Sequence, residues 1–244
     1  MAGFGCPPRV TCVLLNLELA SFRTTAERII TPNALERLTR LIADTPTEPL
    51  LRQMVDRKRR TESELAEIAR GRIPLGDEGE VIDAWMQAFS ASTSSISAIN
   101  LVTPDYWLAG SEFSAKQSEI QSGARQRGVT IRRIFVLATS SKEEAALVLR
   151  VGEQQRRIGI DVRFTNMARV LNSPAYGKSA PALGNAVDLV LFDLNIALLT
   201  YTDPRTHQIQ RGILSSERST VDAAALFFEH LWTIAEPRMG QDMQ

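Results

Sequence analysis

The chain has 244 residues, of which 44% are hydrophobic and 23% are charged. These values are ordinary for a soluble globular protein, and the length suffices for one large domain or two modest ones. Lys plus Arg and Asp plus Glu number 28 each. The overall charge therefore indicates neither a nucleic-acid-binding protein nor a membrane-binding protein.

The charge is distributed unevenly along the chain. Residues 116–169 carry 11 Lys or Arg against 5 Asp or Glu, whereas residues 182–244 carry 4 against 8. A basic middle and an acidic C-terminal part can attract each other, either within one molecule or between two copies of it.

The cysteines and the N-terminal apolar run indicate a cytoplasmic protein. Cys6 and Cys12 are the only cysteines, which is too few for a disulfide framework or a zinc site of about four ligands. The run "VTCVLLNLELA" is shorter than the roughly 20 apolar residues that cross a bilayer. Arg9 is the only charge before it, and "NLELASF" is a poor signal-peptide cleavage site. We therefore predict no membrane contact.

Residues 24–72 are predicted to be helical. Thr31 and Pro32 are a standard N-cap and first helical residue, and Thr61 with Glu64 forms a capping box before a helix that ends at Gly71. Three short helices beside the cluster "RKRR", residues 57–60, are compatible with a DNA-binding helix-turn-helix. The same cluster is more typical of a solvated turn between helices, and no glycine marks the short turn before a recognition helix.

Strands and helices alternate after this segment. A break at "RIPLGDEGE" precedes a helix, and a loop at "SPAYGKSAPALGN" precedes a hairpin, an edge strand and a closing helix that ends before Pro237. This alternation predicts a mostly parallel sheet covered by helices. The expected helices are 81–92, 111–127, 142–158 and 219–236, and the expected strands are 95–102, 131–138, 160–165, 186–193, 196–202 and 207–216.

The strand at "RGVTIRRIFVLATS" begins with two arginines. Alternation places Arg132 and Arg133 on opposite faces, and we expect both to be solvated where the strand leaves its burial. Ligands of open α/β sheets gather at the carboxyl ends of strands, which favours residues 103–106, 138–141 and 166–180 as the rim of a ligand site. The candidate ligand-binding residues are Thr103, Asp105, Arg133, Thr139, Ser140, Ser141, Lys178 and Asp193.

The order of elements resembles the phospholipase D-like superfamily. The resemblance is carried by "DYWLAGSEFSAKQSEIQSGARQRGVTIRRIFVL", "VLRVGEQQRRIGIDVRF", "VDLVLFD" and "AALFFEHLWTIAEP". It implies a phospholipase D-like mixed α/β sheet flanked by helices over residues 76–237. An N-terminal helical region, residues 1–75, would precede this domain, and a tail, residues 238–244, would follow it.

The resemblance does not extend to the catalytic motif of the family, His-x-Lys-x-x-x-x-Asp. With Asp193 in the aspartate position, Ala186 takes the place of the histidine and Asp188 that of the lysine. A methyl group cannot attack phosphorus, and a carboxylate repels a phosphate. Neither His207 nor His230 restores the motif. We therefore expect the fold to be kept and the phosphodiesterase chemistry to be lost, with Ala186 and Asp193 on one strand.

Two functions follow from this. The first is a non-catalytic sensor, regulator or adaptor that uses no cofactor or metal and binds an anionic ligand such as a nucleotide, a nucleic acid or a protein partner. Its candidate cations include Arg132, Arg133, Arg156, Arg157 and Lys178, which could also be solvated surface charges. The alternative is an enzyme of nucleotide or phosphate-ester chemistry with a relocated site. It would resemble a nucleoside deoxyribosyltransferase or be a metal-dependent phosphodiesterase with Glu112, Asp188 and Asp193.

A homodimer is the expected assembly. Catalytic phospholipase D-like proteins build one site from two copies of the domain, and this chain carries one copy, so the resemblance implies an isologous pair. The closing helix, "AAALFFEHLW", is apolar on more than one side, which is typical of an interface. The N-terminal helices of the same chain could instead cover it.

Overall fold

The structure is a computed structural model that describes residues 59, 61–101, 112–138, 142–203 and 208–238. The chain divides into two compact units, Met1–Ala69 and Arg70–Gln244. In the first unit residues 61–69 are helical, as the capping box predicts. The other predicted N-terminal helices, and the cluster 57–60 apart from Arg59, lie outside the described residues.

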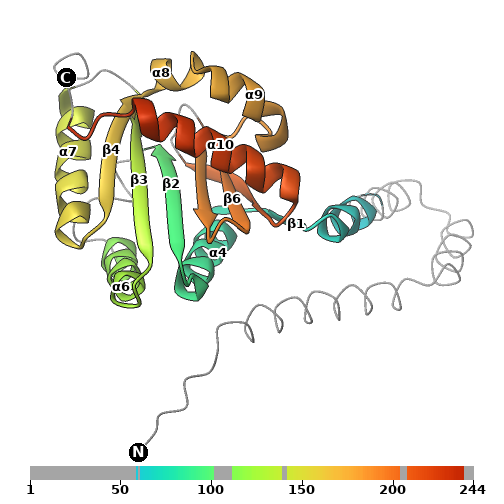
Figure 1. Ribbon diagram of the computed structural model, residues 1–244. Helices are drawn as coiled ribbons and strands as arrows, with labels where there is room; N and C mark the ends of the chain where they lie inside the picture. The colour runs from blue at the N-terminus through green and yellow to red at the C-terminus, as the bar shows by residue number, and fades with distance from the viewer. Residues whose placement is uncertain (1–58, 60, 102–111, 139–141, 204–207, 239–244) are drawn as a thin grey trace, which may run out of the picture. The chain divides into compact units, whose positions relative to one another are not determined.

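The second unit is built on a seven-stranded sheet in the order β1-β7-β6-β5-β2-β3-β4 (Figure 1). Strands β2, β3 and β4 are parallel to one another, and the other neighbouring pairs are antiparallel. The strands are β1 (Arg72–Leu75), β2 (Ser95–Leu101), β3 (Thr130–Leu137), β4 (Asp161–Asn166), β5 (Asp188–Phe192), β6 (Ile196–Thr202) and β7 (Ile209–Ser215).

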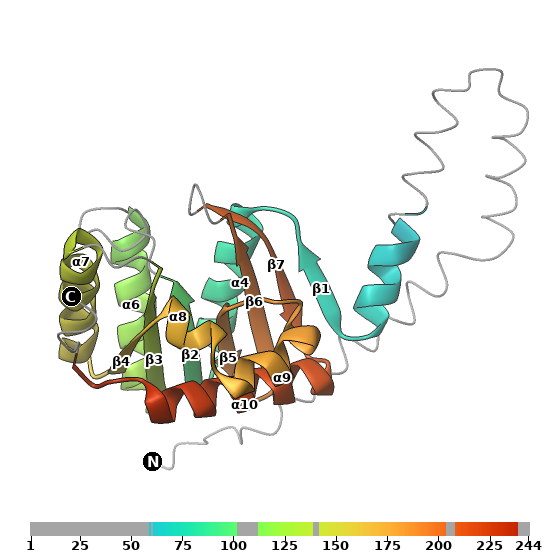
Figure 2. The same ribbon diagram turned by 90° about the horizontal axis from the view of Figure 1, so that it is seen from above.

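Helices cover both faces of the sheet (Figure 2). One face, here called the α6 face, carries α4 (Glu78–Ala91), α6 (Glu112–Gln126) and α7 (Lys142–Arg157). The other, the α10 face, carries α8 (Met167–Leu171), α9 (Pro174–Leu183) and α10 (Arg218–Ile234). Each layer encloses its own hydrophobic core. Among the described residues no helix is long and apolar enough to span a bilayer.

The predicted fold class, a mixed α/β sheet flanked by helices, is confirmed. The alternation from β2 to β4 and the hairpin of β5 and β6 follow the sequence pattern. The predicted mostly parallel sheet is wrong, because only the β2–β3 and β3–β4 pairs are parallel and the other four pairs, formed by the hairpin strands and β1, are antiparallel. The predicted break at "RIPL" is instead β1, which pairs with β7 and makes β7 an internal strand. Pro74 lies within β1, and a proline is tolerated there because β1 is at the edge of the sheet.

The predicted loop at 173–185 is wrong, because it contains the helix α9. The Ser173 side chain caps its first turn by accepting from the Tyr176 N–H at 3.2 Å, and Pro174 occupies the first turn. Gly184 ends the helix with a left-handed φ of 57°. Pro181 inside the helix and the many small residues obscured these start and stop signals in the sequence.

Most of the apolar surface of α10 is covered within the same chain. Phe227 contacts Tyr176 of α9, with ring centroids 5.7 Å apart. Phe228 and Trp232 stack at 5.5 Å, and the Arg132 and Arg163 guanidinium groups lie 4.8 Å and 4.4 Å from the Phe228 and Trp232 centroids, respectively. The large apolar side chains of α10 that stay exposed are Leu226 and Ile234.

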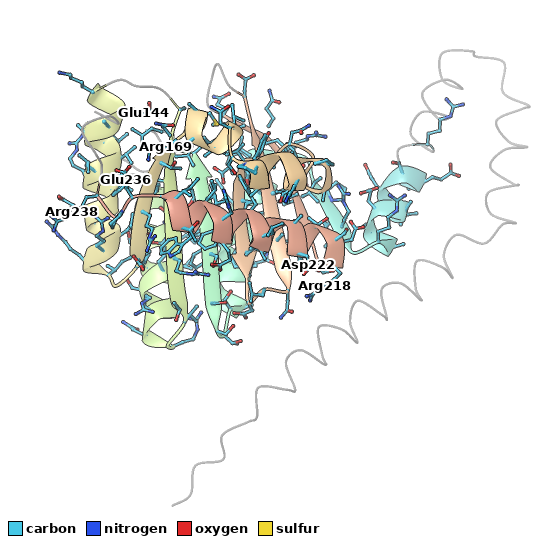
Figure 3. All side chains as sticks on the ribbon, turned by 45° about the horizontal axis from the view of Figure 1, so that its top comes forward. Glu144, Arg169, Arg218, Asp222, Glu236 and Arg238 are labelled. Atoms are coloured by element: carbon cyan, nitrogen blue, oxygen red, sulfur yellow. The ribbon has the colours of Figure 1, made fainter. Side chains whose placement is uncertain are left out.

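The segment after α10 is hydrogen-bonded to β4, the strand at one edge of the sheet. The backbone of Glu236 exchanges two hydrogen bonds of 2.8 Å with Phe164 of β4. The Glu236 carboxylate also pairs with Arg169 of α8 at 2.7 Å (Figure 3). This contact shields the edge of β4 from pairing with another strand.

Candidate ligand-binding pocket

A pocket opens on the α6 face, near the carboxyl end of β2. Its volume is about 80 Å³, several times what one water molecule needs. Its apolar side chains come mainly from α4, β6 and β7. Its polar side chains come from α6 and from β2, β3, β5 and β6. It is lined by Val81, Ile82, Trp85, Asn100, Leu101, Gln117, Arg133, Asp188, Val190, Leu198, Thr200, Thr202 and Ile209.

Arg133 forms part of the floor of this pocket. It lies on β3 and is 1% exposed. Its Nη1 donates to Gln155 Oε1 at 2.7 Å. With the Gln121 amide oxygen facing it, Nη1 and Nη2 also donate to that oxygen, each at 3.2 Å, while Gln121 Nε2 donates to Gln155 Oε1 at 2.8 Å. Burial lowers the pKa of Arg133 to about 9 although nearby Asp188 raises it, so the group stays charged at neutral pH.

The position of Arg133 overturns its predicted solvation. Alternation along β3 does place Arg132 and Arg133 on opposite faces, but neither side chain lies at a solvated end of the strand. Arg132 packs over α10, where it pairs with Glu229, and Arg133 enters the core beneath α6 and α7. The two arginines therefore hold helices on opposite sides of the same strand.

Asp188 lies at the start of β5, next to the end of β2. Its carboxylate accepts from Asn100 Nδ2 at 3.2 Å and from the Leu101 N–H at 3.1 Å. Burial raises its pKa to about 7, outweighing these two hydrogen bonds and the charge of Arg133, all of which lower it. Near neutral pH the Asp188 carboxyl group is therefore present in both its protonated and its ionised form.

Several polar groups of the pocket have unused hydrogen-bonding capacity. Gln117 and Thr200 are 5% and 8% exposed, and neither side chain has a hydrogen-bond partner in the described parts of the chain. Asn100 Oδ1 is buried and has no partner either. Buried polar groups are normally hydrogen-bonded, so this cluster indicates a place for a polar ligand or ordered water.

The other predicted ligand residues are not gathered at this pocket. Lys178 is exposed on α9, which covers the α10 face. Asp193 lies beyond the opposite end of β5 from Asp188. The remaining candidates, Thr103, Asp105, Thr139, Ser140 and Ser141, and the side chain of Glu112 lie outside the described residues.

Asp193 joins the β5–β6 turn to the start of β2. Its carboxylate accepts from the N–H groups of Thr93, Ser94 and Ser95 at 2.8–2.9 Å and from the hydroxyl groups of Thr93 and Ser94. Partial burial raises the pKa of Asp193, but the hydrogen bonds, led by that from Ser95, outweigh it and lower the pKa below its usual value.

Asp188 and Asp193 cannot bind one metal ion together. They are five positions apart along an extended chain, which is roughly 16 Å, and the Asp193 oxygens already accept hydrogen bonds from several donors. Among the described residues there is no cluster of three or more His, Cys, Asp or Glu side chains that could hold a metal ion.

Ala186 and Asp193 do not share a strand, contrary to the sequence prediction. β5 comprises only Asp188–Phe192, because the chain turns through Asn185, whose φ is 64°, and the Ala186 N–H bonds to the Leu183 carbonyl. Ala186 is buried in the core of the α10 face. Residues 130–137 of β3 and 188–192 of β5 nevertheless lie in near-neighbouring strands, since only β2 separates them.

We expect Asp193→Ala to lower the free energy of unfolding by about 2–3 kcal/mol at pH 7, because it removes an ionised acceptor shared by three backbone donors. Asp193→Asn is the matched control; it keeps one acceptor and tolerates the left-handed φ of 51°, so it should lose about half as much. Because the pKa of Asp193 is depressed in the folded state, the difference in free energy of unfolding between the native chain and Asp193→Ala should shrink as the pH falls below about 4. Urea unfolding at pH 7 and pH 3 measures it, and equal stability of all three proteins at pH 7 would exclude the role.

The sequence analysis did not single out Gln117, which lines the pocket, or Gln121, which contacts Arg133, although a signal for both exists. Gln117, Gln121 and Ala124 are buried on α6 at intervals of four and three residues, which is the spacing of a helix face that packs on a core. Two amides on such a face require polar partners inside the protein. Arg133 is the partner of Gln121 and, with Gln155 from α7, completes a buried polar cluster.

Neither a protein-family model nor a curated protein matches the chain. One similar solved structure is the archaeal chromatin protein TrmBL2, described as having a novel mode of DNA binding. It has a TM-score of 0.41 and 11% identity, over 86% of this chain and 72% of that protein. Another is phosphatidylserine synthase of Haemophilus influenzae Rd KW20, with a TM-score of 0.40 and 12% identity over 68% and 39% of the two chains.

A third similar structure is polyphosphate kinase of Porphyromonas gingivalis, with a TM-score of 0.35 and 17% identity over 60% and 23% of the two chains. This chain therefore spans well under half the length of the synthase and the kinase. The structural similarity to these proteins accords with the predicted phospholipase D-like resemblance at the level of the fold. At these identities the likeness concerns the arrangement of helices and strands alone.

Proposed function

We propose that the protein is a non-catalytic ligand-binding domain, of a sensor or regulatory kind, and that the pocket beside Asp188 and Arg133 receives the ligand. The observation that carries this is the Gln117 amide, which is 5% exposed, faces the pocket and has no hydrogen-bond partner among the described residues. Concave sites with an apolar wall and a few converging polar groups are the usual places for small ligands.

The absence of a suitable nucleophile at the expected position supports a non-catalytic role. Ala186, which takes the histidine position of the related motif, is 2% exposed and packs in the core of the other face. Asp188, in the lysine position, is a partly buried carboxyl group. His230 is on α10, on the opposite side of the sheet from the pocket.

A small ligand fits the described surface better than a nucleic acid. Two of the arginines that could meet phosphates are engaged within the chain. Arg132 pairs with Glu229, and Arg156 donates to the carbonyl groups of Val162 and Pro237 and lies over the Phe164 ring. Polyanion binding requires basic side chains that are accessible to phosphates.

Two measurements test the proposal. The protein should not hydrolyse bis(p-nitrophenyl) phosphate above background, with or without Mg²⁺ or Mn²⁺. Native mass spectrometry of the protein purified from its host should show a bound small molecule that denaturation releases and that Gln117→Leu loses. Metal-dependent hydrolysis abolished by Asp188→Asn would favour the enzyme alternative, and a ligand retained by Gln117→Leu would place the site elsewhere.

We also propose a homodimer, supported by Leu226, which is 54% exposed on α10, and Ile234, which is 38% exposed near the end of that helix. Two exposed aliphatic side chains on one helix are a modest apolar patch. Sedimentation at micromolar concentrations should give twice the monomer mass, and Leu226→Glu should shift the equilibrium toward monomer. A constant monomer mass over this concentration range would remove the proposal.

A further inference from the structure

We propose that the pocket selects a small neutral molecule that presents an N–H donor beside a carbonyl-type acceptor, as a carboxamide, a ureide or the edge of a nucleobase does. This inference rests on the proposed ligand-binding function and names the chemical class of the ligand. It follows from which hydrogen-bonding groups of the pocket are still unsatisfied and from how its two charges are placed.

The unsatisfied acceptor of the pocket favours a ligand that donates hydrogen bonds. Asn100 Oδ1 is a buried acceptor without a donor. The Asp188 carboxylate beside it has two donors, Asn100 Nδ2 and the Leu101 N–H, whereas two carboxylate oxygens offer about four acceptor sites. A carboxylate such as acetate has only acceptors, so it would leave Asn100 Oδ1 unpaired and would be repelled by ionised Asp188.

The same pocket also offers donors to a ligand acceptor. Gln117 can donate through Nε2 and accept through Oε1, and the Thr200 hydroxyl can do either. Both side chains line the pocket and have no hydrogen-bond partner within the described segments. A ligand with a donor and an acceptor side by side can pair with Asn100 Oδ1 and also with the donors of Gln117 and Thr200, whereas a donor-only ligand would leave that N–H and O–H without an acceptor.

The charges of the pocket disfavour cationic ligands as well as anionic ones. Arg133 is held by the amides of Gln121 and Gln155, and the nearby charge of Asp188 partly offsets its own, so an amine or guanidinium ligand would meet a positive charge as well as a negative one. Among the described residues that line the pocket, Arg133 and Asp188 are the charged ones. A neutral ligand can lie beside Arg133 and Asp188 without adding an uncompensated charge to a poorly solvated site.

The rest of the pocket suits a small apolar body. Val81, Ile82 and Trp85 come from one face of α4, and Leu198 and Ile209 come from β6 and β7. An aromatic or aliphatic group attached to the amide would lie against these side chains. The volume of about 80 Å³ limits the enclosed part of the ligand to a head group of a few heavy atoms.

Matched amide and carboxylate probes test this directly. Calorimetric titrations of the full chain at pH 7.5 would use acetamide against acetate, benzamide against benzoate and nicotinamide against nicotinate. We expect at least one amide to bind, and each bound amide to bind at least tenfold more tightly than its carboxylate. Asp188→Asn should weaken amide binding about tenfold, because an ionised acceptor becomes a neutral one, and should strengthen carboxylate binding by removing the like charge.

Proton linkage supplies a second readout. A ligand that donates to Asp188 stabilises its ionised form, so amide affinity should increase from pH 6 to pH 8, whereas carboxylate affinity should decrease. Asp161→Asn makes the same substitution at an exposed site on β4 and should change neither affinity. Urea unfolding of each variant would show that it is folded at the titration pH.

The outcomes separate the two proposals. Carboxylates that bind as tightly as the amides, or more tightly, would overturn the neutral-ligand inference and leave the pocket as a ligand site. Amide binding that Gln117→Leu and Asp188→Asn both leave unchanged would place the site elsewhere and overturn both proposals. Failure of all six probes to bind at 10 mM would overturn the ligand class and would leave the proposed function to be decided by the co-purified ligand.

Discussion

The Asp188→Asn variant is expected to be more stable than the native chain at pH 7.5, by about 2–4 kcal/mol. The folded-state pKa of Asp188 is raised from 3.8 to about 7. A difference of about three pKa units corresponds to roughly 4 kcal/mol. The side chain keeps some contact with solvent through the pocket, which reduces this figure. Asparagine keeps one acceptor for the Leu101 N–H without the cost of a buried negative charge.

The sign of the pH dependence distinguishes this cause from a simple gain in packing. Because the folded state binds the Asp188 proton more tightly than the unfolded chain does, its stabilising contribution is fully present below pH 3.8 and is lost as the pH rises to about 7. The native chain should therefore lose stability relative to Asp188→Asn between pH 5 and pH 7.5. Urea unfolding at pH 5, 6 and 7.5 measures the difference.

The control for this prediction is Asp161→Asn, which should leave the free energy of unfolding within about 0.5 kcal/mol of the native value at every pH, as surface substitutions usually do. A constant difference between Asp188→Asn and the native chain across this range would contradict the titration of Asp188. We expect Asp188→Asn to be more stable but to bind amides more weakly, because binding sites commonly keep groups that destabilise the fold.

The Arg133→Met variant is expected to lose about 3 kcal/mol of unfolding free energy at pH 7. Arg133 donates to the side-chain oxygens of Gln121 and Gln155 inside the protein. Removing the donor leaves buried acceptors with fewer partners, at about 1–3 kcal/mol each, and takes away the positive charge that partly offsets the burial of Asp188. Methionine is flexible and fills much of the same space.

A second variant separates the loss of hydrogen bonds from the loss of volume. Replacing the whole cluster, as Arg133→Met with Gln121→Leu and Gln155→Leu, should recover at least half of the lost stability, since an apolar core of similar volume carries no unpaired polar groups. Arg157→Met, at an exposed position at the end of α7, is the surface control and should cost about 0.5 kcal/mol or less. A triple variant less stable than Arg133→Met alone would show that the unpaired glutamine oxygens do not cause the loss of stability. Guanidinium unfolding at pH 7 gives all three values.

Local pattern in the sequence determined the main elements of the fold. Alternating apolar strands and amphipathic helices from β2 to β4, the β5–β6 hairpin and the long closing helix all follow from periodicity and turn residues that lie close together in the chain. The sequence also shows that Ala186 takes the histidine position of the motif that the resemblance implies, and the loss of phosphodiesterase chemistry stays a prediction from it.

Only the tertiary structure decided the roles of Arg133, Asp188 and Asp193. Two adjacent arginines before an apolar run resemble a solvated strand end, and the burial of Arg133 depends on Gln121 and Gln155, which come from two different helices. Asp193 finds its donors about 100 residues earlier in the chain, and Asp188 meets Asn100 88 positions away. Strand β1 likewise exists because Arg72 pairs with Ser215. These contacts join distant segments, so no local pattern contains them, and folding alone brings their partners together.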